Sequence, residues 1–196
     1  MYVIMNTITD TEENTMAENI LIISTSLRSG SNSETLANEV LKGASDAGNN
    51  AELVSLKDKQ IAFCKGCLAC QKTGKCVIKD DANEITEKMK NADVIVFATP
   101  VYYYGMSGQM KTLLDRANSL YISDYKFRRI FLVTASAEAE KETAEKTIIG
   151  LKGWIECYTK CVYAGEFLGG GFNDPNEIKG NAGTMKEAYE FGKGLC

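Results

Sequence analysis

The chain contains no histidine in its 196 residues. This absence excludes Ser-His-Asp and Cys-His nucleophilic mechanisms and every histidine metal ligand. An excess of basic residues is also missing, since 22 Lys and Arg stand against 26 Asp and Glu. No apolar run approaches the roughly 18 residues needed to cross a bilayer. We therefore expect neither nucleic acid nor a membrane as partner, and we expect the chemistry to come from a bound cofactor.

The chain has seven cysteines, and this odd number does not fit a secreted disulfide framework. A reducing cytoplasm is the location that we expect. Residues 1–18 are mostly polar and acidic and precede the first apolar run. We predict a disordered or flexible tail over 1–18 and one domain over 19–196.

Four of the cysteines lie within the thirteen residues 64–76, in the pattern C-x2-C-x2-C-x5-C. This spacing is typical of the ligands of an iron-sulfur cluster. Gly66 and Gly74 permit the positive φ values that a chain wrapping a cluster needs. A structural zinc site and a metal-free loop of reduced cysteines remain alternatives. The four cysteines are Cys64, Cys67, Cys70 and Cys76.

Short apolar runs alternate with amphipathic segments along the whole domain. This alternation predicts an α/β fold with a doubly wound parallel sheet of five strands and helices on both faces. The expected strands are 20–23, 51–56, 93–98, 129–134 and 162–168. The first two expected helices begin after Ser31 and Asp81, and a fourth spans about 140–158. The third is marked by Met110, Leu113, Leu114 and Ala117, and the last by Met185, Ala188 and Tyr189.

In such a sheet, ligands bind at the carboxyl ends of the strands. The loop 24–33 is rich in hydroxyl groups and enters a helix N-terminus, which predicts a phosphate site, with simple helix capping as the alternative. It has neither a Walker motif nor G-x-G-x-x-G, so a mononucleotide phosphate is the best candidate. Segment 99–106 contains three adjacent tyrosines whose rings and backbone amides would line a flat heterocycle, unless they serve packing or a subunit contact.

Three segments together, 22–33, 98–102 and 109–116, resemble the flavodoxin-like NAD(P)H-dependent FMN reductases. With the four cysteines between them, the chain is similar to the iron-sulfur flavoproteins of that family. The resemblance extends from about Asn19 to the C-terminus. It implies a flavodoxin-like fold with strand order 2-1-3-4-5.

The resemblance also implies the residues of the site, and it requires no catalytic side chain. FMN would be bound noncovalently, and the cysteines would hold a [4Fe-4S] cluster. Because the cysteine loop follows the second expected strand, we expect it on the same carboxyl edge of the sheet as the flavin. Asp115 and Arg116 would form a structural pair. Around the FMN phosphate we expect Ser24, Ser26, Arg28, Asn32 and Ser33. Around the isoalloxazine ring we expect Pro100, Val101, Tyr102, Tyr103, Tyr104 and Gly105, with Thr134 and Ala135 closing the site.

The implied activity is an oxidoreductase that takes electrons from NAD(P)H and passes them to a quinone, a flavin or an electron carrier. The alternative is a non-enzymatic FMN/[4Fe-4S] protein that exchanges electrons with a ferredoxin-type carrier. A homodimer or higher homo-oligomer is expected. Asp80 and Asp81 resemble a paired carboxylate site, but directly before a helix we predict that they serve as a cap, with Asp81 as the capping residue. We predict that Cys157 and Cys161 pack.

Overall fold

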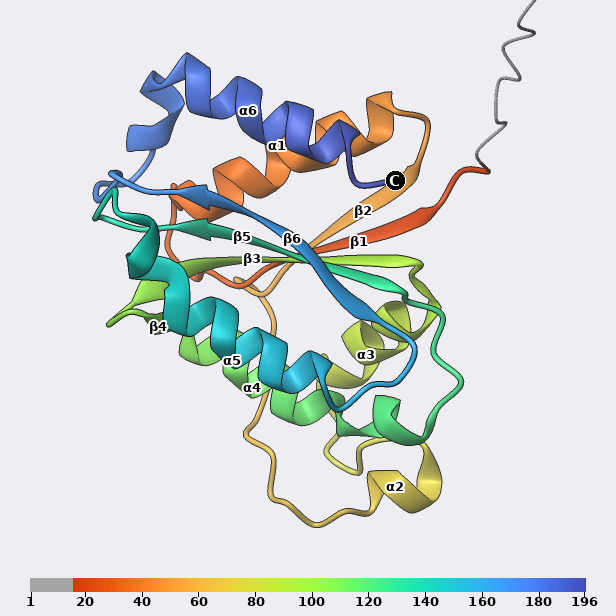
Figure 1. The fold of residues 1–196 in the computed structure, drawn as a ribbon. Coiled ribbons are helices and arrows are strands. Elements are labelled where there is room, and N and C mark those ends of the chain that lie inside the picture. Colours follow the sequence, from red (N-terminus) through yellow and green to blue (C-terminus); the bar gives the residue numbers. More distant parts are fainter. Residues whose placement is uncertain (1–15) are drawn as a thin grey trace, which may run out of the picture.

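The computed structural model describes residues 16–196, and its centre is a sheet of five parallel strands in the order β2-β1-β3-β5-β6 (Figure 1). Counted without the short strand β4, this is the predicted order, which is confirmed. The predicted tail over 1–18 falls mainly on residues 1–15, outside the described part. The strands are β1 Asn19–Ser24, β2 Asn50–Ser55, β3 Val94–Tyr102, β5 Arg129–Ala135 and β6 Val162–Gly169.

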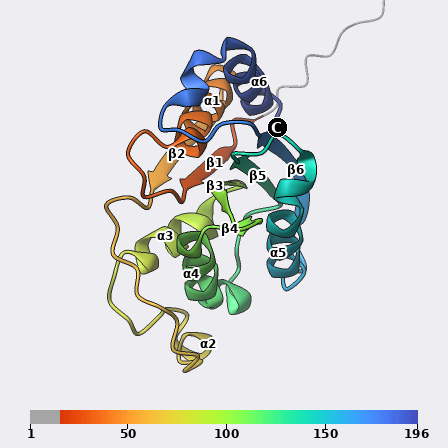
Figure 2. The same cartoon turned by 90° about the vertical axis from the view of Figure 1, so that its left-hand side faces the viewer.

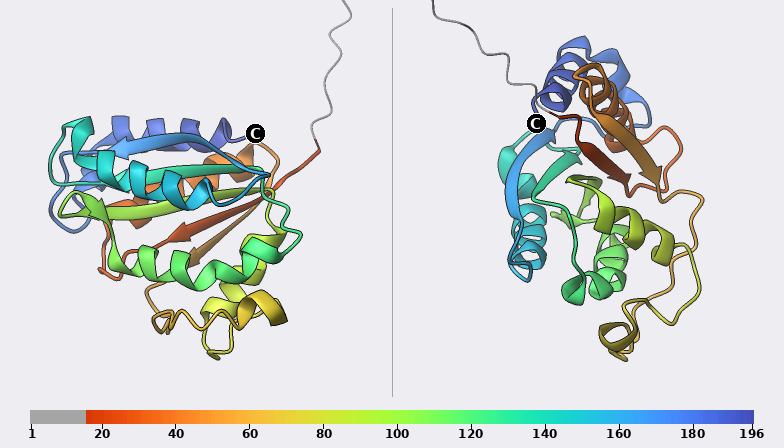
Figure 3. Two further views of the ribbon diagram at one scale, coloured as in Figure 1. Left: turned by 60° about the horizontal axis from the view of Figure 1, so that its bottom comes forward. Right: turned by 90° about the vertical axis from the view of Figure 1, so that its right-hand side faces the viewer.

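Helices cover both faces of the sheet, as predicted. Helices α1 and α6 lie on one face, and α3, α4 and α5 lie on the other (Figures 1 and 3). No helix of the described residues is long and apolar enough to cross a membrane. The helices are α1 Asn32–Asp46, α2 Cys70–Thr73, α3 Ala82–Asn91, α4 Gly108–Arg116, α5 Glu145–Ile155 and α6 Ala182–Lys193. Three short 3-10 helices are η1 Ala117–Ile122, η2 Lys141–Ala144 and η3 Glu177–Gly180.

Local sequence accounts for the first strand and helix. The run Ile20–Ile23 is fully buried because helices cover both faces of β1, which explains its unbroken apolar sequence. Helix α1 begins after Ser31, whose Oγ accepts a hydrogen bond from the backbone N–H of Glu34 at 3.3 Å. This is the predicted cap, and it satisfies one of the free N–H groups of the first turn.

Helices α1 and α6 touch through their backbones. A Cβ added at Gly43 would collide with the carbonyl oxygen of Tyr189, and one added at Gly192 would collide with that of Val40. The two glycines therefore set the spacing of the helix pair that covers β1, β3 and β5.

The strand β4, Gly105–Met106, was not expected from the sequence. It pairs antiparallel with the end of β3, and the turn between them holds Tyr103 and Tyr104 at φ values of 51° and 63°. A two-residue turn of this kind normally uses Asn and Gly, because both central residues need positive φ. Two adjacent tyrosines are not typical of such a turn, so their sequence did not predict it.

Candidate functional site

A cavity of about 130 Å³ lies at the carboxyl edge of the sheet. The β1–α1 loop, the end of β3 and the segments after β5 and β6 surround it. Most of the predicted FMN residues meet there. The predicted residues in its wall are Ser26, Arg28, Asn32, Ser33, Pro100, Val101, Tyr102 and Ala135.

The N-terminus of α1 gives the cavity features that suit an anion. The first N–H groups of a helix have no partner within the helix, and the helix dipole is positive at this end. The hydroxyl oxygens of Ser31 and Ser33 lie 3.0 Å apart beside them, and Ser26 accepts from the N–H of Arg28 at 3.3 Å. The residues present therefore fit a phosphate monoester.

Arg28 and Asn32 also hold the loop that follows β6. Arg28 Nη1 donates to the carbonyl of Asn173 at 2.7 Å, and Asn32 Nδ2 donates to that of Asp174 at 2.9 Å. Asn32 Oδ1 accepts from the N–H of Ile178 at 3.3 Å. The side-chain amide of Asn32 is thus largely engaged within the protein, and its role in the structure is to fix one wall of the cavity.

Five residues of this wall were not expected from the sequence. The three glycines that directly follow the last predicted strand were the available signal, since such a run marks a close approach of backbone. The missed residues are Ser31, Ser136, Ala137, Phe172 and Asn173.

Two predicted hydroxyl residues lie below the cavity and not in its wall. Ser24 and Thr134 are buried at the ends of β1 and β5, and neither hydroxyl has a hydrogen-bond partner in the described residues. The neighbouring Thr25 donates to the carbonyl of Ala98 at 3.1 Å and lies 3.0 Å from Ser107 Oγ. Because Ser107 caps α4, this contact joins the start of α4 to β1 and β3.

The tyrosine turn projects from the edge of the site. Tyr103 is fully exposed, and Tyr102 is 50% exposed. Tyr104 donates a hydrogen bond to Glu138 Oε1 at 3.1 Å, which raises the pKa of the Tyr104 phenol. Glu138 Oε2 accepts in turn from Thr143 at 2.9 Å, so this carboxylate is fixed beside the turn.

A second cavity, of about 530 Å³, brings all four clustered cysteines together. Within residues 16–196, no three Cys, Asp or Glu side chains already converge as ligands of one metal ion. The thiols instead surround a common space between the cysteine loop and the C-terminal ends of α4 and α5. Other residues in its wall are Arg116, Asn118, Tyr121, Trp154, Cys157 and Tyr158.

The backbone of the cysteine loop turns back on itself repeatedly. Gly66, Leu68 and Gly74 have φ values of 63°, 56° and 71°. N–H groups point at two of the sulfurs: the backbone of Gly66 at Cys64 Sγ, 3.4 Å, and Asn118 Nδ2 at Cys70 Sγ, 3.3 Å. Four thiols around one space with N–H donors on the sulfurs fit an iron-sulfur cluster.

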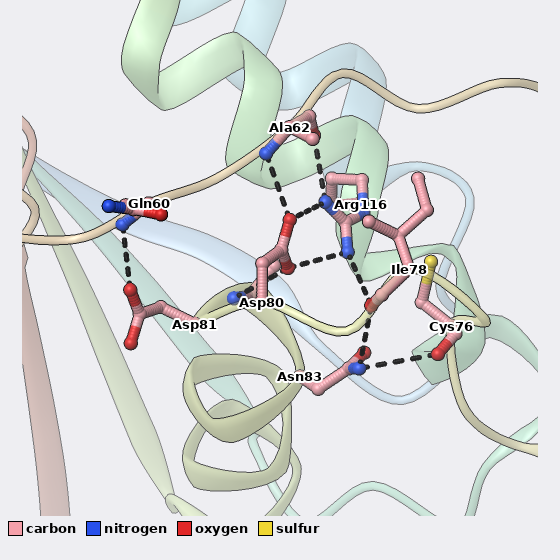
Figure 4. Close-up of polar contacts among 9 residues, drawn as sticks. Gln60, Ala62, Cys76, Ile78, Asp80, Asp81, Asn83 and Arg116 are labelled. Atoms are coloured by element: carbon pink, nitrogen blue, oxygen red, sulfur yellow. Dashed lines mark hydrogen bonds and ion pairs between the residues drawn. The ribbon is translucent and has the colours of Figure 1, made fainter.

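The predicted pairing of Asp115 with Arg116 is wrong. Arg116 forms a bidentate ion pair with Asp80: Nη1 donates to Oδ2 at 2.5 Å and Nη2 donates to Oδ1 at 2.8 Å (Figure 4). The same two nitrogens also donate to the backbone carbonyls of Ala62 and Ile78. Asp115 pairs instead with Lys111 at 2.5 Å. Residue 115 points to solvent because it lies on the outer face of α4, whereas residue 116 is buried.

The predicted cap of α3 is confirmed for Asp80 and wrong for Asp81. The side chain of Asp81 makes no capping bond and accepts from the N–H of Gln60 at 2.7 Å. Asp80 Oδ1 accepts from the N–H of Ala82, the first residue of α3, at 3.2 Å. The carboxylate one position earlier takes the capping bond while also holding Arg116.

Two of the three remaining cysteines, Cys157 and Cys161, differ from each other. Cys161 packs in the core as predicted, and burial raises the pKa of its thiol to about 11. Cys157 is exposed and lies in the wall of the cysteine cavity, so the prediction that it packs is wrong.

Comparison with known proteins decides the family. The family model described as NADPH-dependent FMN reductase matches residues 19–162. This chain belongs to the NADPH-dependent FMN reductase family. Membership places it among FMN-dependent oxidoreductases and confirms the resemblance from which the site was predicted.

Within this reductase family, the chain is similar to iron-sulfur flavoproteins of archaea. It is 34% identical over 167 residues to one from Methanocaldococcus jannaschii, covering 85% of this chain and 83% of the relative. It is 31% identical over 175 residues to one from Methanosarcina thermophila, covering 89% and 91%. Among solved structures, the chain is similar to NAD(P)H:quinone oxidoreductase from Methanothermobacter marburgensis, with a TM-score of 0.71 and 15% sequence identity. The match covers 92% of this chain and 100% of the solved one. That likeness shows the shared fold.

The position of the cysteines corrects the expectation that a cluster lies on the same sheet edge as FMN. The loop leaves the carboxyl end of β2 and carries α2 beyond α3 and α4, on the side away from the sheet (Figures 1 and 2). Its four clustered cysteines line a cavity together with the C-terminal residues of α4 and α5. Both helices run antiparallel to the strands, so their C-terminal ends lie toward the opposite edge of the sheet. In this member of the reductase family, the walls of the two cavities therefore share no residue.

Proposed function

We propose that the protein is an FMN-dependent oxidoreductase that takes electrons from NAD(P)H and passes them to a quinone, a flavin or an electron carrier. The observation that carries this proposal is the carboxyl-edge cavity. It is built from the start of α1 and the end of β3 in a chain of the FMN reductase family. Bound FMN would supply hydride acceptance and the release of one or two electrons.

The chain's own residues bind and orient the cofactor. The N–H groups at the start of α1 and the hydroxyls of Ser26 and Ser33 would hold the phosphate, and Arg28 would add a positive charge. Asn32 keeps the loop after β6 in place. Segment 100–105 would line the ring, so that no side chain need act as an acid or base.

We further propose that Cys64, Cys67, Cys70 and Cys76 hold a [4Fe-4S] cluster, which would supply one-electron transfer. Two N–H donors, from Gly66 and Asn118, already point at cysteine sulfurs. Iron and acid-labile sulfide analysis of anaerobically purified protein tests this proposal. Four of each per chain are expected, and zinc in their place would contradict it.

Anaerobic rapid mixing of the FMN-loaded protein with NADPH and with NADH tests the reductase activity. Flavin absorbance should bleach with at least one nucleotide. Bleaching by neither would refute the reductase.

The site itself is tested by FMN affinity. Ser33→Ala should weaken FMN binding roughly tenfold or more, since a hydrogen bond to a charged group contributes about 1.5–3 kcal/mol. Ser29→Ala is the matched control: Ser29 is exposed in the same loop and contacts Lys57 outside the cavity. Equal loss of affinity in both variants would contradict the assigned phosphate site.

A second candidate function, an electron carrier without nucleotide oxidation, is favoured by the surface position of the cysteine loop. Cys64 and Cys67 are exposed, so a partner protein would have direct access to a cluster there. Reduction of the protein by a ferredoxin-type carrier, without bleaching by either nucleotide, would establish this function.

For the oligomeric state we propose a homodimer with the tyrosine turn near its interface. The full exposure of Tyr103 supports this, because an exposed aromatic side chain is typical of interface cores. Analytical ultracentrifugation of the wild-type protein and of Tyr103→Ser tests this proposal. If the substitution leaves the dimer intact, the interface does not include Tyr103.

A further inference from the structure

One nitrogen of Arg116 is left without a partner. The side chain is fully buried, and its two terminal nitrogens donate to Asp80, Ala62 and Ile78. The Nε atom is also buried, and it has no hydrogen-bond partner in the described residues. Buried guanidinium N–H groups are normally satisfied, because an unmade hydrogen bond to such a group is costly.

The free Nε belongs to a residue in the wall of the cysteine cavity. Of the arginines in the described residues, only Arg116 lies there. The terminal nitrogens are fixed by the ion pair with Asp80, so the guanidinium cannot turn to find another partner for Nε. An acceptor on the cavity side would complete its hydrogen bonds.

Cys76 is the sulfur that stands beside this guanidinium. Arg116 Nη2 donates to the carbonyl of Ile78, two residues from Cys76, at 3.3 Å (Figure 4). Asn83 Nδ2 holds the same short segment by donating to the carbonyls of Cys76 and Ile78 at 3.2 and 2.9 Å.

We propose that Arg116 is a positioning residue that sets the reduction potential of the cluster, with Nε–H donating a hydrogen bond to the Cys76 thiolate. This inference rests on the proposed [4Fe-4S] ligation by Cys76. One-electron reduction places more negative charge on the thiolate sulfurs, so a donor aimed at one of them stabilises the reduced form and raises the potential. Asp80 acts through Arg116 by fixing its orientation.

The test compares cluster potentials in holoprotein by anaerobic redox titration with EPR detection. Arg116→Lys keeps the positive charge and removes the Nε donor. Its cluster should be at least tenfold harder to reduce, a shift of about 59 mV to lower potential for one electron, while the FMN potential stays unchanged. Arg129→Lys is the matched control, since Arg129 pairs with Glu18 away from the cavity and should move neither potential.

A second measurement uses wild-type protein, so its result does not depend on whether a variant folds. Wild-type protein labelled with ¹⁵N-arginine should show coupling of an arginine nitrogen to the reduced cluster in pulsed EPR. Lack of this coupling, or the wild-type potential in a cluster-loaded Arg116→Lys protein, would overturn the role of Arg116. Wild-type protein that binds no iron would instead refute the cluster itself and remove the basis of the inference.

Discussion

Among single residues, Asp80 joins both ends of the cysteine loop to the helix layer. Its carboxylate accepts from the N–H of Ala62 before the cysteines, from Ala82 after them, and from Arg116 of α4. Removing one partner of a buried ion pair leaves the other charge uncompensated. The stability of the loop therefore depends on a pair that joins residues 36 positions apart.

We expect Asp80→Asn to lower the free energy of unfolding by about 3 kcal/mol at neutral pH, measured by urea denaturation. Asp115→Asn is the control, because its exposed pair with Lys111 contributes less than about 1 kcal/mol. A similar loss in both variants would contradict the assigned role of Asp80.

The same residue predicts a pH dependence. Burial alone would raise the pKa of Asp80, but the hydrogen bonds from Arg116 and Ala62 outweigh it, and the pKa is lowered. A carboxyl with a lowered pKa stabilises the fold fully above its unfolded value of about 3.9 and loses this contribution as the pH falls through its folded pKa. The stability difference between wild type and Asp80→Asn should thus be constant near neutrality and shrink below about pH 4. A difference that persists in acid would show that the charge is not its source.

At the level of elements, the contact between α1 and α6 depends on glycine. Gly192→Ala should destabilise the protein by about 2 kcal/mol, because the added methyl group meets the backbone of Val40. Gly153→Ala in α5 is the matched control: nothing lies within 4 Å of its added Cβ, so the better helix former should raise stability by up to about 1 kcal/mol. Thermal unfolding of both variants separates the steric effect from helix propensity.

The turn between β3 and β4 carries backbone strain at the proposed flavin site. Tyr103 and Tyr104 both have positive φ, which costs roughly 1–3 kcal/mol for a residue other than glycine. Replacing them by Asn and Gly should raise the stability of the FMN-free protein by about 1 kcal/mol and weaken FMN binding, because the aromatic faces are lost. Urea denaturation and calorimetric titration with FMN measure the two effects. Unchanged FMN affinity would place the isoalloxazine ring elsewhere.

For the whole molecule, α4 separates the two proposed sites. Its nine residues span about 13 Å at 1.5 Å per residue, from the contacts of Ser107 near the carboxyl edge to Arg116 in the cysteine cavity. Each site should therefore be removable without the other. We expect Cys67→Ser to lose iron while retaining FMN and its reduction by nucleotide, and Cys157→Ser to retain both, measured by metal content and anaerobic spectra. Loss of FMN binding in Cys67→Ser would show that the two sites depend on each other.

Much of the fold was predictable from the sequence because its signals are local. The apolar run Ile20–Ile23 and the cap at Ser31 are read from neighbouring residues, and the order of strands followed from the family resemblance. The strand β4 was not predictable, because Tyr103 and Tyr104 adopt φ values that their residue type disfavours. The cavity wall after β6 was not predictable either, because Arg28 and Asn32 hold it through hydrogen bonds to residues about 145 positions away in the sequence.

The sequence by itself determined which groups the molecule has for its chemistry: a hydroxyl-rich loop entering a helix, four cysteines at cluster spacing, and no histidine. Only the tertiary structure decided how they are arranged. Arg116 pairs with Asp80 and not with its neighbour Asp115, since adjacent residues of a helix point in different directions. The cysteines meet the C-terminal residues of α4 and α5 because the long segment between β2 and α3 reaches them there. Local sequence encodes caps and periodicity, whereas contacts between distant residues depend on the paths of the elements that carry them.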